Sequence, residues 1–159
     1  RTFQHYVQEA LFSPAGMMST GFYGEQRVSA ELVAVGIGGT SSMGERNSPA
    51  DWPPVTWALA GSGGVYGSVL DIARWRDAID EEVILSGRSA EKCRSYLTAR
   101  PDENGRRVRF SAGGNDFGFV FVSVELVDED GLLIFAQNNN PIGEEDHNWV
   151  RALIDQMRR

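Results

Sequence analysis

The residues best spaced to act as a nucleophile and its base are Ser89 and Lys92. Lys92 is the sole lysine among 15 basic residues. One turn away on a helix, a lysine amine can accept the proton of a serine hydroxyl and activate the oxygen for attack on an acyl carbon. However, 13 of the 159 residues are serine, and Ser89 stands where a helix over residues 89–99 should have its N-cap. We therefore interpret Ser89 and Lys92 as a chance match to a catalytic serine–lysine pair, with Ser89 serving as a helix cap.

Composition argues against several other kinds of chemistry. With two histidines, His5 and His147, and a lone Cys93, no ligand spacing typical of a metal site occurs. Residues 61–67 are glycine-dense, but Tyr66 takes the third glycine position of G-x-G-x-x-G and no P-loop lysine follows, so a structural turn is expected. We predict no metal and no cofactor.

Charge and hydropathy constrain the partners. The net charge of −7 disfavours nucleic acid, because a basic surface is needed to replace the counterions of phosphate. No apolar run reaches the roughly 18 residues that a membrane span requires. The first residue is Arg1, so we expect a segment of a longer protein. We predict no nucleic-acid partner and no membrane span.

The first third of the chain is predicted to be helix, strand and loop. Apolar residues recur at helical spacing over residues 3–11, and Pro14 ends the pattern. Residues 31–37 are predicted to form a short strand. Residues 38–54 are rich in Gly, Ser, Asn and Pro, which predicts a long surface loop.

The remaining pattern predicts a capped helix followed by a meander. Ser68 and Asp71 fit a capping box at the start of a helix, in which the serine oxygen accepts from the amide three residues on. Residues 108–138 alternate apolar and polar side chains around turns at Gly113–Asp116 and Asp128–Gly131. This alternation is typical of a three-stranded antiparallel meander.

A terminal helix completes the predicted architecture. Glu144, Glu145 and Asp146 suit a helix N-terminus, and an apolar stripe follows from Trp149 to Met157. We expect residues 1–159 to form a single α+β domain or segment, with the helices packed on the meander.

Three segments, in this order, resemble those of a known family. Phe12–Thr20 (FSPAGMMST) resembles the "PLGM..T" turn that follows a helix in class C β-lactamases, DD-peptidases and related esterases. Ala60–Trp75 (AGSGGVYGSVLDIARW) is similar to the family's "aGGl.sTa.DlarF" stretch. Phe110–Phe119 (FSAGGNDFGF), followed by Leu132–Asn138 (LLIFAQN), looks like the family's "HtGg..Gf" strand and the strand after it. The resemblance implies the β-lactamase/transpeptidase-like fold. Because the region of residues 38–54 frames one side of the site in relatives, the resemblance also makes Trp52 and Trp57 candidates for the lining of a cleft.

The resemblance also implies motifs that this chain lacks. Family members carry an acylating Ser-x-x-Lys and a Tyr-x-Asn, and both precede the Pro-Leu-Gly-Met turn. Only about a dozen residues precede Pro14, so both motifs are expected to lie outside the chain. Tyr66-Gly67-Ser68 mimics the tyrosine motif but follows the turn, in the wrong order.

A third family element, Lys/His-Thr/Ser-Gly, lines the site from a strand. By resemblance Ser111 takes the place of its cation, Ala112 that of the hydroxyl and Gly113 that of the glycine. The amide of Gly114 corresponds to an oxyanion-hole donor. Neither Ser111 nor Ala112 can carry a positive charge. The alternative interpretation is that Gly113-Gly114-Asn115 is only a hairpin turn.

These features favour a segment of a serine hydrolase that forms one wall of an acyl-enzyme site and is inactive alone. The implied partner is a small acyl substrate, namely a β-lactam, a peptide or an ester. Because position 111 lacks a cation, an esterase or an inactive relative is favoured over an efficient β-lactamase. The alternatives are a non-catalytic binding or scaffold module on the same fold, and a domain without a cleft.

Overall fold

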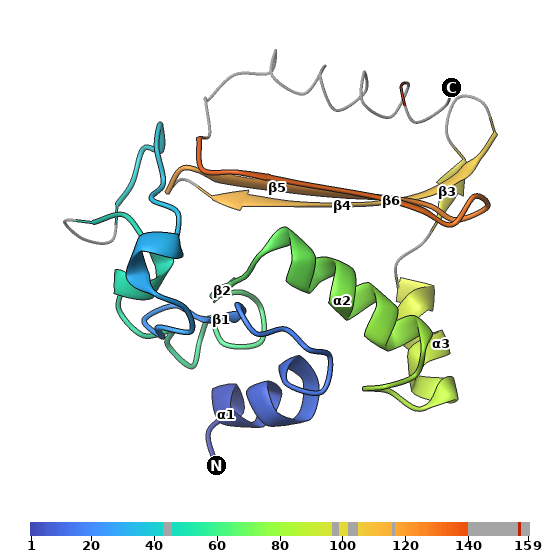
Figure 1. Cartoon of the computed structure of the whole chain (residues 1–159), viewed down its shortest axis with the longest axis horizontal. Coiled ribbons are helices and arrows are strands. Elements are labelled where there is room, and N and C mark those ends of the chain that lie inside the picture. Colours follow the sequence, from blue (N-terminus) through green and yellow to red (C-terminus); the bar gives the residue numbers. More distant parts are fainter. Residues whose placement is uncertain (43–45, 97–98, 102–104, 116, 140–155, 157–159) are drawn as a thin grey trace.

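A computed structural model describes residues 1–42, 46–96, 99–101, 105–115, 117–139 and 156. An antiparallel sheet forms one layer, and a long helix, α2 (Val69–Asp80), lies against one of its faces (Figure 1). A helical and irregular part at the N-terminus packs below that helix, around a second, two-stranded sheet. The predicted α+β class is confirmed.

The N-terminal helix forms as predicted but changes type before it ends. Helix α1 (Phe3–Val7) begins after Thr2, whose hydroxyl accepts from the His5 amide, and continues as the π-helix η1 (Gln8–Phe12). The chain then turns before Met17. The buried side chains of this part form one core with α2 and consist of Val7, Phe12, Ala15, Met17, Phe22 and Ala78.

A small sheet joins two segments that resemble family motifs. Strand β1 (Gly21–Phe22) pairs antiparallel with β2 (Val65–Tyr66), with Gly21 opposite Tyr66. This pairing places the turn at residues 12–20 beside the glycine-dense segment at residues 61–67.

The strand predicted at residues 31–37 is wrong. Its first residues belong to a 3-10 turn, η2 (Ala30–Leu32), and only Ile37 forms a bridge, parallel to Asn139. The Ile37 amide donates to the carbonyl of Asn138, whereas the Gly36 amide donates to Asn47 in the following loop. Since a strand needs one continuous partner and the described amides find two, this apolar segment packs as irregular chain.

Helix α2 begins at the residue that the capping box predicts. Ser68 is its N-cap, and the serine oxygen accepts from the Asp71 amide at 3.1 Å. The Asp71 carboxylate does not return to the Ser68 amide; it contacts the turn at residues 19–20 instead. The predicted cap is therefore confirmed, and Asp71 has a further, tertiary role.

Helix α3 (Gly87–Tyr96) starts two residues earlier than predicted, so the N-cap assignment of Ser89 is wrong. The residue before the helix is Ser86, and its carbonyl accepts from the Ala90 amide in the first turn. The Ser86 hydroxyl lies 3.4 Å from that of Ser89. The sequence offers two serines three residues apart, and the capping rule does not distinguish them.

The main sheet has four strands in the order β3-β4-β5-β6, so the prediction of three is corrected. The predicted meander corresponds to β4 (Arg107–Asn115), β5 (Phe119–Leu126) and β6 (Gly131–Gln137). Strand β3 (Arg100–Pro101) pairs with only the first two residues of β4. A strand of two residues, one of them proline, has no alternation to detect.

The first of the two predicted turns is misplaced. Strand β4 runs through Asn115, with Gly113 opposite Phe121 and Gly114 opposite Val120, so both glycines lie in the ladder. The hairpin-turn interpretation of these glycines is therefore wrong. The second turn occupies residues 127–130, as expected, and Asp130 adopts a positive φ of 51° at its end.

The predicted terminal helix, with His147 and Trp149, lies outside the described residues. Among the described helices none is long and apolar enough to cross a membrane.

Substituting Asp71 should destabilise the fold more than any exposed acid on the same helix. Asp71→Ala removes a fully buried carboxylate that accepts from Ser19 and Thr20 and leaves both donors without it. We expect a loss of about 3 kcal/mol in the free energy of unfolding, measured by urea denaturation with tryptophan fluorescence. Asp77→Ala, with a side chain 59% exposed, is the control and should cost below about 0.5 kcal/mol. Equal losses for the two variants would contradict the anchoring role.

Candidate functional site

A cavity of about 1070 Å³ opens between the N-terminal part and one end of the main sheet. Its walls come from the turn at residues 12–20, residues 23–34, the loop at residues 38–54, the glycine-dense segment, α2, and the adjoining ends of β4, β5 and β6. Apolar and small residues dominate this lining, which includes Phe12, Met17, Tyr23, Trp52, Gly63, Gly64, Trp75, Gly113, Phe121 and Ala136. A lining of this kind is typical of a small-molecule site.

One buried carboxylate holds the wall below the sheet. Asp71 accepts from the Ser19 amide at 2.8 Å and from the Thr20 hydroxyl at 2.9 Å. Arg74, one turn further along the helix, donates to its other oxygen at 2.8 Å. Because Ser19 and Thr20 also line the cavity, the same bonds that join α2 to the turn shape the wall.

Trp52 holds the loop at residues 38–54 against the sheet. Its indole is 2% exposed and packs on Tyr23, Phe117 and Phe119. The indole N–H donates to the side-chain oxygen of Asn47 at 3.1 Å, while the amide nitrogen of Asn47 donates to the Phe117 carbonyl. Trp52 therefore combines a core role with its place in the cavity lining.

The predicted cleft role of Trp57 stays untested. Its side chain is 90% exposed, and it is not among the described residues that line the cavity. The prediction rests on the place of this region beside the site in relatives, and exposed aromatics are common.

Strand β4 presents the residues that resemble the family's third motif. Directly paired residues share a face, so Gly113 lies on the same face as Phe121 and Ala136, and all three line the cavity. Ser111 is exposed and lies two residues earlier on that face. Ala112 and Gly114 alternate with them along the strand, opposite Val122 and Val120. The structure brings Gly113 to the cavity, and the catalytic roles of all four remain predictions.

Among the described strands, none continues the pairing along the outer edge of β4 beyond Val108. Strand β3 pairs only with Arg107 and Val108, so no described strand pairs with that edge from Phe110 to Asn115. An edge of this kind presents backbone donors and acceptors that an extended ligand can join as an added strand.

Two sequence matches to family motifs remain, Ser89–Lys92 and Tyr66-Gly67-Ser68. The first lies outside the described cavity lining, and the Tyr66 hydroxyl of the second already has hydrogen-bond partners. Ser89 and Lys92 are exposed on α3, and neither belongs to the described cavity lining. Tyr66 belongs to the cavity lining, but its hydroxyl donates to the Glu25 carbonyl at 2.6 Å and accepts from the Arg27 amide at 3.2 Å. Tyr66 therefore joins two chain segments.

Comparison with known proteins gives a match in structure. No family model matches the chain, and no curated protein matches it at a significant level. The structure resembles a penicillin-binding protein from Bacillus halodurans (TM-score 0.66, 19% identity), covering 98% of this chain and 50% of that one. It also resembles the octameric penicillin-binding protein homologue from Pyrococcus abyssi (TM-score 0.69, 18% identity, 98% and 38% covered).

A third similar structure is the D-amino acid amidase from Ochrobactrum anthropi SV3, solved with L-phenylalanine amide (TM-score 0.60, 16% identity, 98% and 52% covered). The chain has a β-lactamase/transpeptidase-like fold. It spans about half the length of the solved chains it matches, or less. The resemblance inferred from the three sequence segments is confirmed at the level of the fold.

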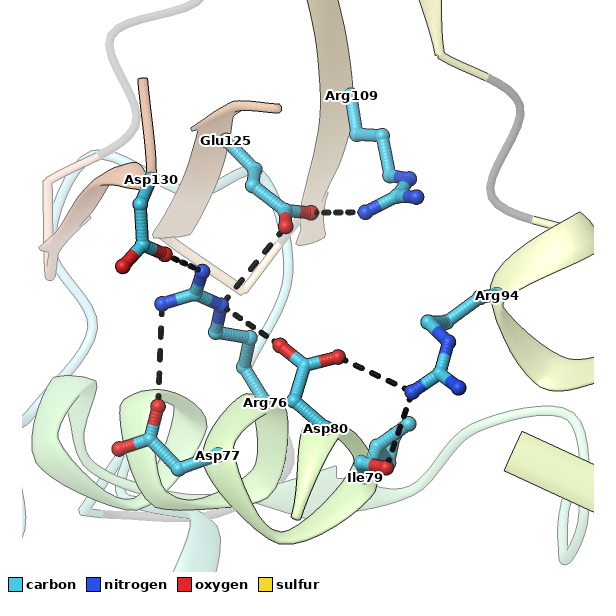
Figure 2. Close-up of polar contacts among 8 residues, drawn as sticks. All are labelled: Arg76, Asp77, Ile79, Asp80, Arg94, Arg109, Glu125 and Asp130. Carbon is cyan, nitrogen blue, oxygen red and sulfur yellow. Dashed lines mark hydrogen bonds and ion pairs between the residues drawn. The ribbon is translucent and has the colours of Figure 1, made fainter. Parts of the chain in front are cut away.

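A charge network fastens α2 to the sheet of this β-lactamase-like fold (Figure 2). Arg76 on the helix donates to Asp130 in the β5–β6 turn at 2.5 Å. Its Nε lies 3.1 Å from Asp80 and 3.8 Å from Glu125, as ion-pair contacts without hydrogen-bond alignment. Arg109 on β4 donates to Glu125 at 2.8 Å. The network thereby joins α2 to β5 and, through Glu125, to β4. The far ends of these two strands border the cavity.

The same network raises the pKa of Arg76, its central cation, and extends to α3. The hydrogen bond with Asp130 raises the pKa of Arg76 above its ordinary value; partial burial opposes this, and the carboxylates of Glu125 and Asp80 reinforce it. Arg94 on α3 contacts Asp80 and the Ile79 carbonyl, at 3.3 and 3.2 Å (Figure 2). Sequence reasoning missed this network, because its members are up to 54 residues apart.

Removing the central cation should loosen the joint between helix and sheet. Arg76→Met keeps much of the alkyl stem but leaves Asp80, Glu125 and Asp130 without their shared partner. We expect the free energy of unfolding, measured by urea denaturation, to fall by about 1–2 kcal/mol. Arg88→Met, an exposed arginine on α3, is the matched control and should change stability by less than about 0.5 kcal/mol. Indistinguishable midpoints for the two variants would refute the joint.

Proposed function

We propose that this chain is the part of a serine hydrolase that forms one wall of its acyl-enzyme site, with the nucleophile and its base supplied from outside these residues. The observation that carries this is the cavity where three regions converge: the Asp71-anchored turn, the glycine-dense segment and the glycine-bearing end of β4. On the family resemblance, these three regions match three family segments.

The arrangement suits the binding of an acyl group. The outer edge of β4 beyond Val108 can hydrogen-bond an extended acyl chain, and Gly113 keeps the cavity face of that strand clear of side-chain atoms. The amide of Gly114 is the expected oxyanion donor, a contribution that depends on backbone geometry rather than on a side chain. This wall would orient the carbonyl and stabilise its developing charge, whereas bond formation requires a serine placed opposite.

The similar structures are consistent with this role. Two are penicillin-binding proteins or homologues, and the third is an amidase solved with an amide ligand. Because the chain spans about half of their length or less, hydrolysis is proposed for a longer protein that contains this segment.

A non-catalytic binding module is the second candidate. Ser111 leaves the strand without the family's cation, and no described serine with a lysine or histidine beside it lines the cavity. The two functions share the same walls and differ in whether a covalent adduct forms.

A fluorophosphonate probe separates the two candidates. We expect a longer protein containing this segment to be labelled at a serine outside the 159 residues, and the 159-residue chain alone to remain unlabelled. Ser89→Ala should leave both results unchanged, because Ser89 is exposed on α3. Absence of labelling in the longer protein would favour the binding module, and labelling at Ser89 would overturn the dismissal of the Ser89–Lys92 pair.

A strand variant then tests the proposed wall. A Cβ on Gly113 would meet only Phe121 Cδ1, at 4.0 Å, so Gly113→Val fits the strand but places methyl groups on the cavity face. We expect the labelling rate of the longer protein to fall roughly 10- to 100-fold, because the acyl group loses its close approach. Ser123→Val is the control and should keep the labelling rate. Ser123 lies on the neighbouring strand β5, on the same face but outside the described cavity lining. Equal labelling rates for the two variants would contradict a role of β4 in the site.

A further inference from the structure

No residue in the described part of the cavity lining carries a charge. None of its described residues is Asp, Glu, Lys, Arg or His, although charged residues make up 23% of the chain. Its hydroxyl and amide side chains are neutral and are contributed by Ser19, Thr20, Tyr23, Ser62, Tyr66, Ser68, Gln137 and Asn138. Such groups can hydrogen-bond a carbonyl or an amide but cannot neutralise an anion.

Arg27 and Arg74 stand next in sequence to the lining residues Val28 and Trp75, and both are paired with acids. Arg74 binds Asp71 at 2.8 Å, and Arg27 contacts Glu25 at 3.1 Å. A cation released from either pair would leave its carboxylate exposed to the same ligand. Neither pair therefore offers a net positive charge to a bound carboxylate.

Strand β4 carries its two arginines at the end away from the cavity, and the first of them, Arg107, donates to Asp128 at 2.9 Å. Arg109 lies on the same face as Ser111 and Gly113, but it precedes them and is held at 2.8 Å by Glu125. Figure 2 shows Arg109 and Glu125 within the Arg76 network, which joins the helix to the sheet. The positive charge of this strand is thus used in the fold.

We infer that this site selects uncharged acyl compounds, neutral esters and amides with an aromatic or aliphatic group, over substrates that carry a carboxylate. The inference rests on the proposed function and names its substrate class. A carboxylate in this cavity would lose water without gaining a cation from the described lining, which is costly. The net charge of −7 opposes an anion further, whereas Tyr23, Trp52, Trp75 and Phe121 offer apolar surface to a neutral ligand.

A matched pair of ligands tests the inference on the 159-residue chain. N-acetyl-phenylalaninamide and N-acetyl-phenylalanine differ by a neutral amide in place of a carboxylate. Trp52 and Trp75 line the cavity, so their fluorescence, excited where phenylalanine does not absorb, reports binding. We expect the amide to bind at least about tenfold more tightly at pH 7. Equal or tighter binding of the acid, or no binding of the amide at millimolar concentration, would overturn the inference.

Adding a cation should reverse the preference. Ala136 is exposed, lines the cavity and pairs with Phe121, so Ala136→Arg places a guanidinium at the site. We expect the acid to gain at least about tenfold in affinity. Ser89→Arg adds the same charge on α3, outside the described lining, and should leave both affinities unchanged. A similar gain in the two variants would mean that net charge, and not the cavity, governs the preference.

The result of this binding experiment can be distinguished from the result of the labelling experiment that tests the proposed function. Equilibrium binding needs no nucleophile, so overturned ligand selectivity together with fluorophosphonate labelling of the longer protein would leave the hydrolase and change its substrate class. Selective amide binding without labelling would leave a module that recognises neutral acyl compounds.

Discussion

The arrangement of this molecule depends on one buried carboxylate. Asp71 is fully enclosed and satisfies a backbone amide, a hydroxyl and a guanidinium, which offsets the cost of removing its charge from water. Its partners at residues 19–20 are some 50 residues away in sequence, so these bonds join the N-terminal turn to the start of α2. The wall of the cavity below the sheet follows from this single attachment.

Helix α2 transmits that attachment to the sheet. Asp71 and Arg76 are five residues apart, which places them about 140° apart around the helix, so one side chain meets the turn and the other meets the strands. The Arg76 contacts to Glu125 and Asp130 are polar and specific in position, whereas the apolar core of the N-terminal part could accept small rotations of the helix. The cavity lies between these two attachments, and its dimensions depend on both.

The same use of charge explains why the cavity is neutral. The arginines on α2 and β4 hold the fold together, and the lining is left with hydroxyls, amides, glycines and apolar surface. In the proposed site the fold would supply the walls, and the described lining carries no charge. Ser111, two residues before Gly113 on the same face of β4, is uncharged as well.

Local patterns in the sequence determined the Ser68 cap, the helix after it and the alternation of the main strands, because each depends on neighbours a few residues apart. They did not determine the two-residue strand β3, the irregular packing of residues 31–37 or the place of Gly113 within the ladder rather than in a turn. Those features depend on which distant backbone groups become available as partners. The network of Arg76, Glu125 and Asp130 and the neutral cavity were likewise decided only by the tertiary structure, because Coulomb interactions and burial depend on distance in space and not on order along the chain.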